Sequence, residues 1–184
     1  MVEMEKLIGL FYGSDTGTTE GIATELEKLI TADFKVENFD MYHVNRVEFS
    51  RYKYFIFGLS TWYDGQLQSD WDTFYDEFCT IDFTGKVAAF FGCGDQFGYG
   101  EWFVDGIGIV AQQFEKAGGK LIGKWSTEGY EFEASKALID EHTFYGLAID
   151  EDNQADLTTE RIEKWCQQIK QEFETAFKEQ IKDF

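Results

Sequence analysis

Hydroxyl-bearing side chains crowd the turn that follows the first apolar run of the chain. The stretch GSDTGTTE, residues 13–20, comes directly after KLIGLFY and contains one serine, three threonines and two glycines. Backbone N–H groups at a helix N-terminus attract anions, and glycine lets the backbone approach an anion closely. Serine and threonine also cap helices routinely, but this many hydroxyls at this place favour a phosphate site over capping alone.

The composition of the same turn restricts the kind of phosphate that it could hold. The turn has no lysine or arginine, so it does not match the GxxxxGKS or GxxxxGKT loop of nucleoside triphosphatases. It also lacks the GxGxxG pattern with which a dinucleotide-binding fold holds a pyrophosphate. The turn therefore predicts a terminal monophosphate held by neutral donors.

Two further loops carry aromatic side chains where polar residues are expected. Trp62 and Tyr63 lie in STWYDGQLQSDW (60–71), directly after an apolar run, and Tyr99 lies among four glycines in GCGDQFGYGEWF (92–103). Small residues around one large ring leave room for a flat ligand, so a planar heteroaromatic group between Trp62 and Tyr99 fits this pattern. The alternative is that these aromatic side chains pack into the core or cover an edge of the sheet.

Short apolar runs alternate with segments of helical period, and this alternation positions the three loops. Strands that are apolar on both faces and separated by helices predict a parallel sheet with helices on both sides. Ligands bind such a sheet at the carboxyl ends of its strands, which is where all three loops are expected. The predicted strands are 6–12, 34–39, 54–59, 86–91 and 120–125, and the predicted helices are 17–30, 68–79, 102–116 and 157–184.

The length of 184 residues fits one domain, and no linker, repeat or low-complexity tract divides the chain. We therefore expect a single domain over residues 1–184. Residues 126–153 are too long for a plain connection between a strand and a helix. We place an insertion there, at about 126–146, near the last strand and with short strands of its own.

The formal net charge of −19 argues against a DNA- or RNA-binding protein. Such a charge repels nucleic acid and attracts basic protein surfaces, although acidity can also serve solubility alone.

Three cysteines without a CxxC pair and two distant histidines offer no disulfide framework, metal site or histidine-based triad. MVEMEKL does not match a signal peptide, and no apolar run approaches the ~20 residues that cross a bilayer. We expect a cytoplasmic protein with no membrane partner.

Taken together, these motifs resemble a long-chain flavodoxin along the whole chain. The resemblance rests on GSDTGTTE, TWYDGQLQSDW and GDQFGYGEWF, while WSTEGYEFEASKAL and FYGLAIDEDNQ are similar to the long-chain insertion. GYGEWFVDGIG resembles most the second flavodoxin of enteric-type bacteria. The resemblance implies a flavodoxin-like α/β fold. This is a three-layer sandwich with a five-stranded parallel sheet of order 2-1-3-4-5, helices on both faces and an insertion in the last strand.

Flavodoxins bind FMN non-covalently and shuttle single electrons at low potential, so the resemblance implies an electron carrier and not an enzyme. The resemblance implies no catalytic residue. It also implies that Trp62 covers the inner face of the flavin ring and that Tyr99 covers the outer face. By motif, the FMN phosphate would be surrounded by Ser14, Asp15, Thr16, Gly17, Thr18 and Thr19. The ring and the ribityl chain would lie near Ser60, Thr61, Trp62, Tyr63, Asp64, Gly65, Gly92, Cys93, Gly94, Asp95, Tyr99 and Asp152.

Two positions near the implied flavin ring call for particular attention. Family members rotate the peptide that corresponds to Tyr63–Asp64 when the flavin is reduced, and Asn or Gly is more usual there. A bulky tyrosine makes the left-handed backbone of such a turn more costly. Cys93 is expected to be a small buried residue and not a reactive thiol.

The resemblance also implies basic-surfaced redox partners for a monomeric carrier, namely a flavodoxin/ferredoxin NADP reductase and electron-accepting enzymes. Two alternatives stay open. An NAD(P)H:quinone reductase of the same fold would need a nicotinamide site. A phospho-receiver module shares the strand order but needs clustered acids at strand ends and a lysine, and the hydroxyl-rich turn argues against it.

Overall fold

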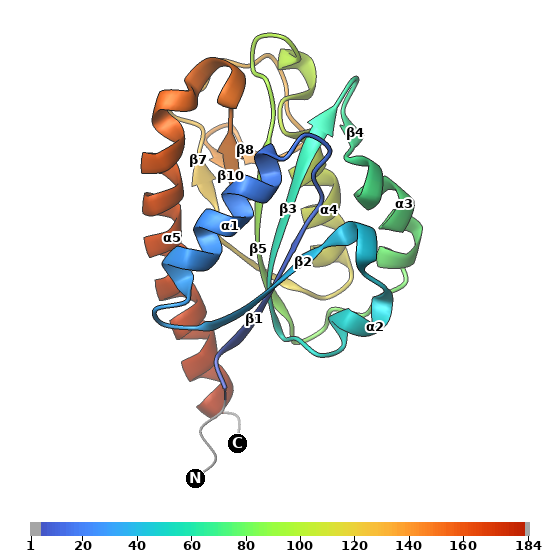
Figure 1. Ribbon diagram of the computed structural model, residues 1–184, viewed down its shortest axis with the longest axis vertical. Coiled ribbons are helices and arrows are strands. Elements are labelled where there is room, and N and C mark those ends of the chain that lie inside the picture. Colours follow the sequence, from blue (N-terminus) through green and yellow to red (C-terminus); the bar gives the residue numbers. More distant parts are fainter. Residues whose placement is uncertain (1–4, 183–184) are drawn as a thin grey trace.

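Apolar strand runs form a parallel β-sheet at the centre of the computed structural model (Figure 1). Helices cover both faces of this sheet, as predicted for strands that are apolar on both sides. The structure describes residues 5–182, so the expectations that concern residues 1–4 and 183–184 lie outside it. Among the described residues, no helix combines the length and the apolar composition that crossing a bilayer requires.

The first four positions of the sheet follow the predicted order. β2 (Lys35–Asp40) lies at one edge and pairs with β1 (Leu7–Tyr12). β1 pairs in turn with β3 (Tyr54–Trp62), and β3 pairs with β5 (Val87–Cys93). All of these pairs are parallel, so the carboxyl ends of β1, β3 and β5 open at the same edge of the sheet.

The fifth position of the sheet is divided between two short strands. β6 (Lys120–Ile122) pairs with the first half of β5, and β10 (Leu147–Ile149) pairs with its second half. The strand predicted to continue to residue 125 ends at Ile122, because Gly123 has a φ of +77° that turns the chain away. The insertion predicted in the last strand therefore lies between β6 and β10.

Four helices form the two outer layers of the sandwich. α1 (Thr18–Ile30) and α5 (Glu151–Lys182) cover one face of the sheet, and α3 (Ser69–Phe78) and α4 (Asp105–Lys116) cover the other (Figure 1). The apolar stripe predicted on the last helix is buried against the sheet. It consists of Ile162, Trp165, Ile169, Phe173 and Phe177.

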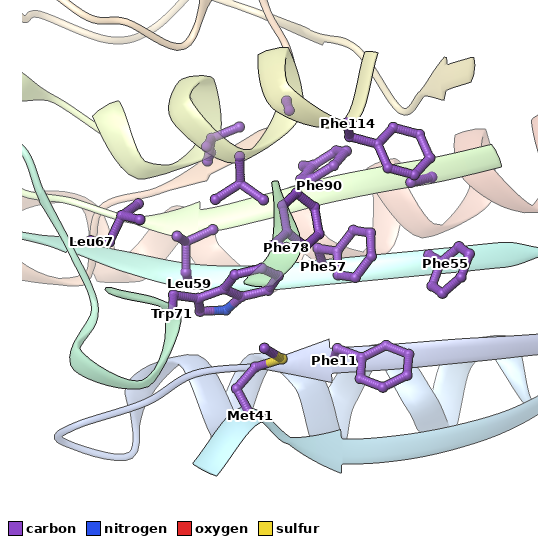
Figure 2. Packing of buried hydrophobic residues seen from close by; sticks show 14 of the residues in the cluster. Phe11, Met41, Phe55, Phe57, Leu59, Leu67, Trp71, Phe78, Phe90 and Phe114 are labelled. Carbon is purple, nitrogen blue, oxygen red and sulfur yellow. The ribbon is translucent and has the colours of Figure 1, made fainter. Parts of the chain in front are cut away.

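Aromatic rings fill the core between the sheet and the helices α3 and α4. Phe57 of β3 is fully buried there. Its ring centroid lies 5.3 Å from that of Phe90 and 5.5 Å from that of Trp71. Phe78 of α3 and Phe114 of α4 complete the packing around the same ring (Figure 2). The high aromatic content of the chain is thus largely explained by the core.

The insertion forms a small antiparallel sheet of its own. Its strands are β7 (Trp125–Ser126), β9 (Thr143–Phe144) and β8 (Leu138–Asp140), in that spatial order. The insertion packs against the segment that leads into α4, where the rings of Phe103 and Phe132 stack with centroids 5.4 Å apart. Through this contact the insertion packs against the end of the third loop.

The predicted starts of the last two helices, at residues 102 and 157, are wrong. The helix after the third loop begins at Asp105, because Val104 adopts a left-handed backbone with a φ of +49°. The last helix begins at Glu151, before the predicted start at Leu157, and is kinked at Gln154. The elements that were not predicted are short: α2 (Arg46–Phe49), β4 (Gln66–Leu67) and 3-10 turns at Met41–His43 and Gly100–Trp102.

Phe57→Ala is expected to destabilise the fold by about 3–5 kcal/mol, because it leaves a cavity among packed rings. Urea unfolding followed by far-UV circular dichroism measures this loss. Phe97→Ala serves as the control, since Phe97 is 62% exposed. Equal losses of stability in the two variants would contradict the described core.

Candidate functional site

Three loops and the start of α5 enclose a cavity at the carboxyl edge of the sheet. Its volume is about 350 Å³, which is within the range of small-molecule sites. The cavity lies where β1, β3 and β5 end, the position expected for a ligand in an open parallel sheet. The residues that line it are Thr16, Thr18, Thr19, Ser60, Thr61, Trp62, Tyr63, Cys93, Gly94, Asp95, Tyr99, Glu151 and Asp152.

The hydroxyl-rich turn enters α1 without a side-chain cap. Gly17 is the residue before the helix, with a left-handed φ of +91°, and no side chain accepts a hydrogen bond from the first helical N–H groups. Ser14 Oγ instead accepts a hydrogen bond from the Gly17 N–H at 3.0 Å. Thr16 and Thr18 are exposed and line the cavity. Because the hydroxyls do not cap the helix, this arrangement favours an anion site over the capping alternative.

Two aromatic side chains form the walls of the same cavity. The Trp62 indole Nε1 donates a hydrogen bond to Ser60 Oγ at 2.9 Å, which fixes the ring at the end of β3. Tyr99 comes from the third loop and is 47% exposed. Neither ring belongs to the buried core, so core packing does not explain them. Partly exposed rings beside a cavity suit stacking against a planar ligand.

Gln68 joins the first loop to the second, although sequence analysis assigned it no role. Its side chain is completely buried, and its Nε2 donates to Asp15 Oδ1 at 3.1 Å and to Asp70 Oδ2 at 2.7 Å. Its Oε1 accepts from the N–H groups of Asp70 and Trp71 and thereby caps α3. One amide thus fixes both the start of α3 and the position of the hydroxyl-rich turn.

Asp150 holds the third loop against the start of α5. Its carboxylate is completely buried and accepts hydrogen bonds from the N–H and the side-chain amide of Gln96, at 3.1 and 2.7 Å. Asn153 donates to the same carboxylate and, at 2.8 Å, to Asp95 Oδ1. This network keeps Asp95 at the wall of the cavity. No sequence motif indicated it, because its members lie far apart in the chain.

The chain is similar over most of its length to one protein family. The model of the flavodoxin family matches residues 10–165. The chain belongs to the flavodoxin family. A flavodoxin of Haemophilus influenzae is 48% identical over 163 residues, which cover 89% of this chain and 93% of the relative. Flavodoxin 1 of Escherichia coli strain K12 is 45% identical over 166 residues, which cover 90% of this chain and 94% of the relative.

A solved structure agrees with this assignment to the flavodoxins. The flavodoxin of Fusobacterium nucleatum bound to flavin mononucleotide has a TM-score of 0.86 and 37% sequence identity to this chain. The similarity covers 91% of this chain and 99% of that one. The fold, including the insertion, is that of a long-chain flavodoxin.

The carboxylates at one side of this flavodoxin's cavity differ in their proton affinity. Partial burial acts to raise the pKa of Asp95, but hydrogen bonds from two N–H groups of the third loop and from Asn153 lower it overall. Burial, and then the neighbouring charges beginning with Asp95, raise the pKa of Asp152. Within the part of the chain that the structure describes, no three His, Cys, Asp or Glu side chains are grouped to hold a metal ion.

Some predicted site residues of this flavodoxin do not line the cavity: Ser14, Asp15, Gly17, Asp64, Gly65 and Gly92. Gly92 lies within β5, where a Cβ would meet Ile107 Cγ1 of α4 at 2.7 Å and the Leu59 carbonyl oxygen of β3 at 2.8 Å, so packing within the fold requires glycine there. Asp15 lines a neighbouring cavity of about 400 Å³. Glu151 lines the main cavity and was not predicted. Its position directly before Asp152 was the only signal in the sequence.

Cys93 is expected to resist alkylation at about pH 8, whereas the exposed Cys79 reacts. Cys93 is half-buried and lines the cavity, so it is less buried than predicted. Burial of its thiol, together with nearby carboxylates, raises the pKa of Cys93 to about 12, although the Thr19 hydroxyl that donates to its sulfur at 3.6 Å acts to lower it. Because the thiolate is the reactive form, little Cys93 is available for reaction. Peptide mapping by mass spectrometry after brief exposure to iodoacetamide measures both sites. Comparable labelling of Cys93 and Cys79 would show that this expectation is wrong.

Proposed function

We propose that this chain binds FMN non-covalently in the cavity and carries single electrons between other proteins. The observation that carries the proposal is the pairing, in one cavity, of a hydroxyl-rich helix N-terminus without lysine or arginine and two partly exposed aromatic rings. A phosphate ester of a planar ring system fits this pairing, and FMN is such a molecule. The FMN-bound flavodoxin of Fusobacterium nucleatum, at 37% identity, supports the proposal.

The first loop would hold the phosphate by neutral donors. Thr16 and Thr18 line the cavity, and Gly17, with its left-handed backbone, leads into α1 between them. We infer that their hydroxyls and the first N–H groups of α1 would meet the phosphate. These groups stabilise negative charge through hydrogen bonds and the helix dipole. The other residues of the predicted phosphate site are Ser14, Asp15 and Thr19. We propose that they fix the conformation of the first loop around the phosphate.

The second and third loops would hold the ring. Trp62 and Tyr99 supply one aromatic surface each. The backbone of residues 61–65 and 92–95 would meet the edges of the ring, and Asp152 would lie towards the ribityl chain. Bound FMN supplies the one-electron redox chemistry. The chain itself binds, orients and partly covers the cofactor. It needs no acid, base or nucleophile for this task, so we propose a carrier and not an enzyme.

Carboxylates beside the cavity would lower the reduction potential of the cofactor. Asp95, Glu151 and Asp152 line the cavity, and Asp64 lies in the second loop. One negative charge about 10 Å from the ring, at an effective dielectric constant of about 40, disfavours an added electron by about 0.8 kcal/mol. Several such charges act in the same direction.

The surface charge would guide the carrier to its partners. A net charge of −19 favours encounters with basic redox proteins, and a flavodoxin/ferredoxin NADP reductase and electron-accepting enzymes are the proposed partners. Assignment to the second flavodoxin of enteric-type bacteria is carried by GYGEWFVDGIG alone and stays a prediction. A single domain over residues 1–184, a monomeric state and a cytoplasmic location also stay predictions.

Purified apo-protein is expected to bind one equivalent of FMN and to turn yellow. Titration followed by flavin fluorescence and visible absorption measures the affinity. A titration in which neither the fluorescence nor the absorption of added FMN changes would refute the proposed function. A steady oxidation of NADH by the protein alone would favour the quinone reductase instead.

Trp62→Ala is expected to weaken FMN binding roughly 5- to 150-fold, because stacking of a planar ring on an aromatic side chain contributes about 1–3 kcal/mol. Tyr42→Ala is a suitable control, since Tyr42 is 74% exposed and does not line the cavity. The same FMN titration compares the two variants. An unchanged affinity in Trp62→Ala would mean that the indole does not contact the cofactor.

Electron transfer from a flavodoxin/ferredoxin NADP reductase is expected to slow as salt rises, because ions screen the attraction between an acidic carrier and a basic partner. Stopped-flow association rates measured from about 20 to 500 mM NaCl test this dependence. Rates that do not fall across this range would contradict electrostatic docking.

A further inference from the structure

Two strained backbone positions lie next to a single contact between the second loop and the start of α4. Among residues 5–182, the only residues other than glycine with a positive φ are Tyr63 at +44° and Val104 at +49°. Left-handed backbone is unfavourable for side chains with a Cβ, and most of all for a β-branched residue such as valine. Such conformations persist where the surrounding structure enforces them. The structure around these two residues therefore has to supply that constraint.

The contact between Gly65 and Asp105 joins the two strained segments. Gly65 comes two residues after Tyr63, and Asp105 comes directly after Val104. A Cβ at position 65 would lie 2.6 Å from Asp105 Oδ2 and 3.2 Å from Trp102 Cδ1. The backbone of the second loop therefore rests directly on the carboxylate of Asp105. Gly65 also has a φ of +86°, so glycine is required there for two reasons.

Asp105 is placed to hold the second loop and not to face solvent. It is only 1% exposed, at the N-terminus of α4, where the helix dipole favours negative charge. Its Oδ1 accepts a hydrogen bond from the Lys136 N–H of the insertion at 2.7 Å. Burial raises the pKa of this carboxyl group, although the Lys136 N–H and charge act to lower it. Such a costly group needs a structural or functional reason.

The residues beside Asp105 bind the loops that form the cavity. The Gly106 N–H donates to Thr61 Oγ1 at 2.9 Å, and Thr61 lines the cavity. On the other side, Val104 Cγ1 would lie 3.0 Å from a Cβ at Gly94 of the third loop. The start of α4 thus contacts the second loop, the third loop and the insertion at once.

We propose that Asp105 is a positioning residue that holds the turn Tyr63–Gly65 in its left-handed conformation and thereby sets the reduction potential of the cofactor. Its carboxylate occupies the space behind Gly65, so the turn cannot relax away from the cavity. The buried negative charge also lies behind the loop that would meet the ring edge. The part of this inference that concerns the potential rests on the proposed function. The part that concerns the turn does not.

Two variants of Asp105 separate the hold on the turn from the effect of the charge. Asp105→Ala empties the space behind Gly65, whereas Asp105→Asn removes the charge with little change in shape. Asp76→Ala and Asp76→Asn are the matched controls, since Asp76 is an exposed residue of α3. Hydrogen exchange of the amides of residues 63–67 in the apo-protein is expected to quicken at least tenfold in Asp105→Ala and not in Asp76→Ala. After loading with FMN, the midpoint potential is expected to rise in Asp105→Asn by more than in Asp76→Asn. Exchange that is equal in the two alanine variants, or potentials that are equal in the two asparagine variants, would overturn the proposal.

A measurement on the unaltered protein covers the case in which Asp105→Asn does not fold. The carboxyl carbon resonance of Asp105, followed by NMR, is expected to shift when FMN is added, whereas that of Asp76 is not. An Asp105 resonance that does not respond to bound FMN would overturn the proposal. Failure of the wild-type chain to bind FMN at all would instead count against the proposed function, because the exchange of the turn is measured without cofactor.

Discussion

When a parallel sheet is covered by helices on both faces, a polar ligand site can form only where its strands end. β1, β3 and β5 are covered by helices on each side and run in the same direction. Their carboxyl ends therefore bring three loops to one edge, whatever the loops contain. The loops of this chain contain hydroxyls, glycines, aromatic rings and carboxylates. The cavity among them is thus a consequence of how the apolar core is built.

The proposed phosphate site lies in an acidic protein, and this is possible because the two interactions involved differ in range. Hydrogen bonds from hydroxyl and N–H groups act on direct contact. The field of distant carboxylates is screened over about 8 Å at physiological ionic strength. A phosphate can therefore be held locally even though the net charge is −19. No lysine or arginine lies among the lining residues, so the negative charges near a bound ring would act on it uncompensated.

The elements and the loop residues with local signals could be predicted from the sequence. The apolar run at Leu7–Tyr12 and the GSDTGTTE turn after it reveal a strand and a helix start without any tertiary information. The phosphate site in that turn stays a prediction. Trp62 and Tyr99 were recognised because aromatic residues are unexpected in such loops.

The residues that join the loops could not be predicted, because their roles depend on contacts between distant segments. In the sequence, Gln68 is an ordinary polar residue. Its role becomes visible only in the structure, where its side-chain amide donates a hydrogen bond to Asp15. Asp150 is one of several adjacent acidic and amide residues until Gln96 folds onto it. The left-handed backbone of Val104, which delays the start of α4, contradicts the local preference of valine and is set by tertiary packing.

The divided outer strand makes this edge of the sheet a poor template for pairing with a strand of another molecule. An unbroken strand at the border of a sheet presents a row of unpaired backbone groups that can recruit a foreign strand, and this is a common route to aggregation. Here β6 and β10 are three residues long each, and the chain leaves the sheet between them. Each segment keeps its own register with β5. Evolution can therefore lengthen or shorten the excursion between them without shifting the alignment of the strands beneath the cavity.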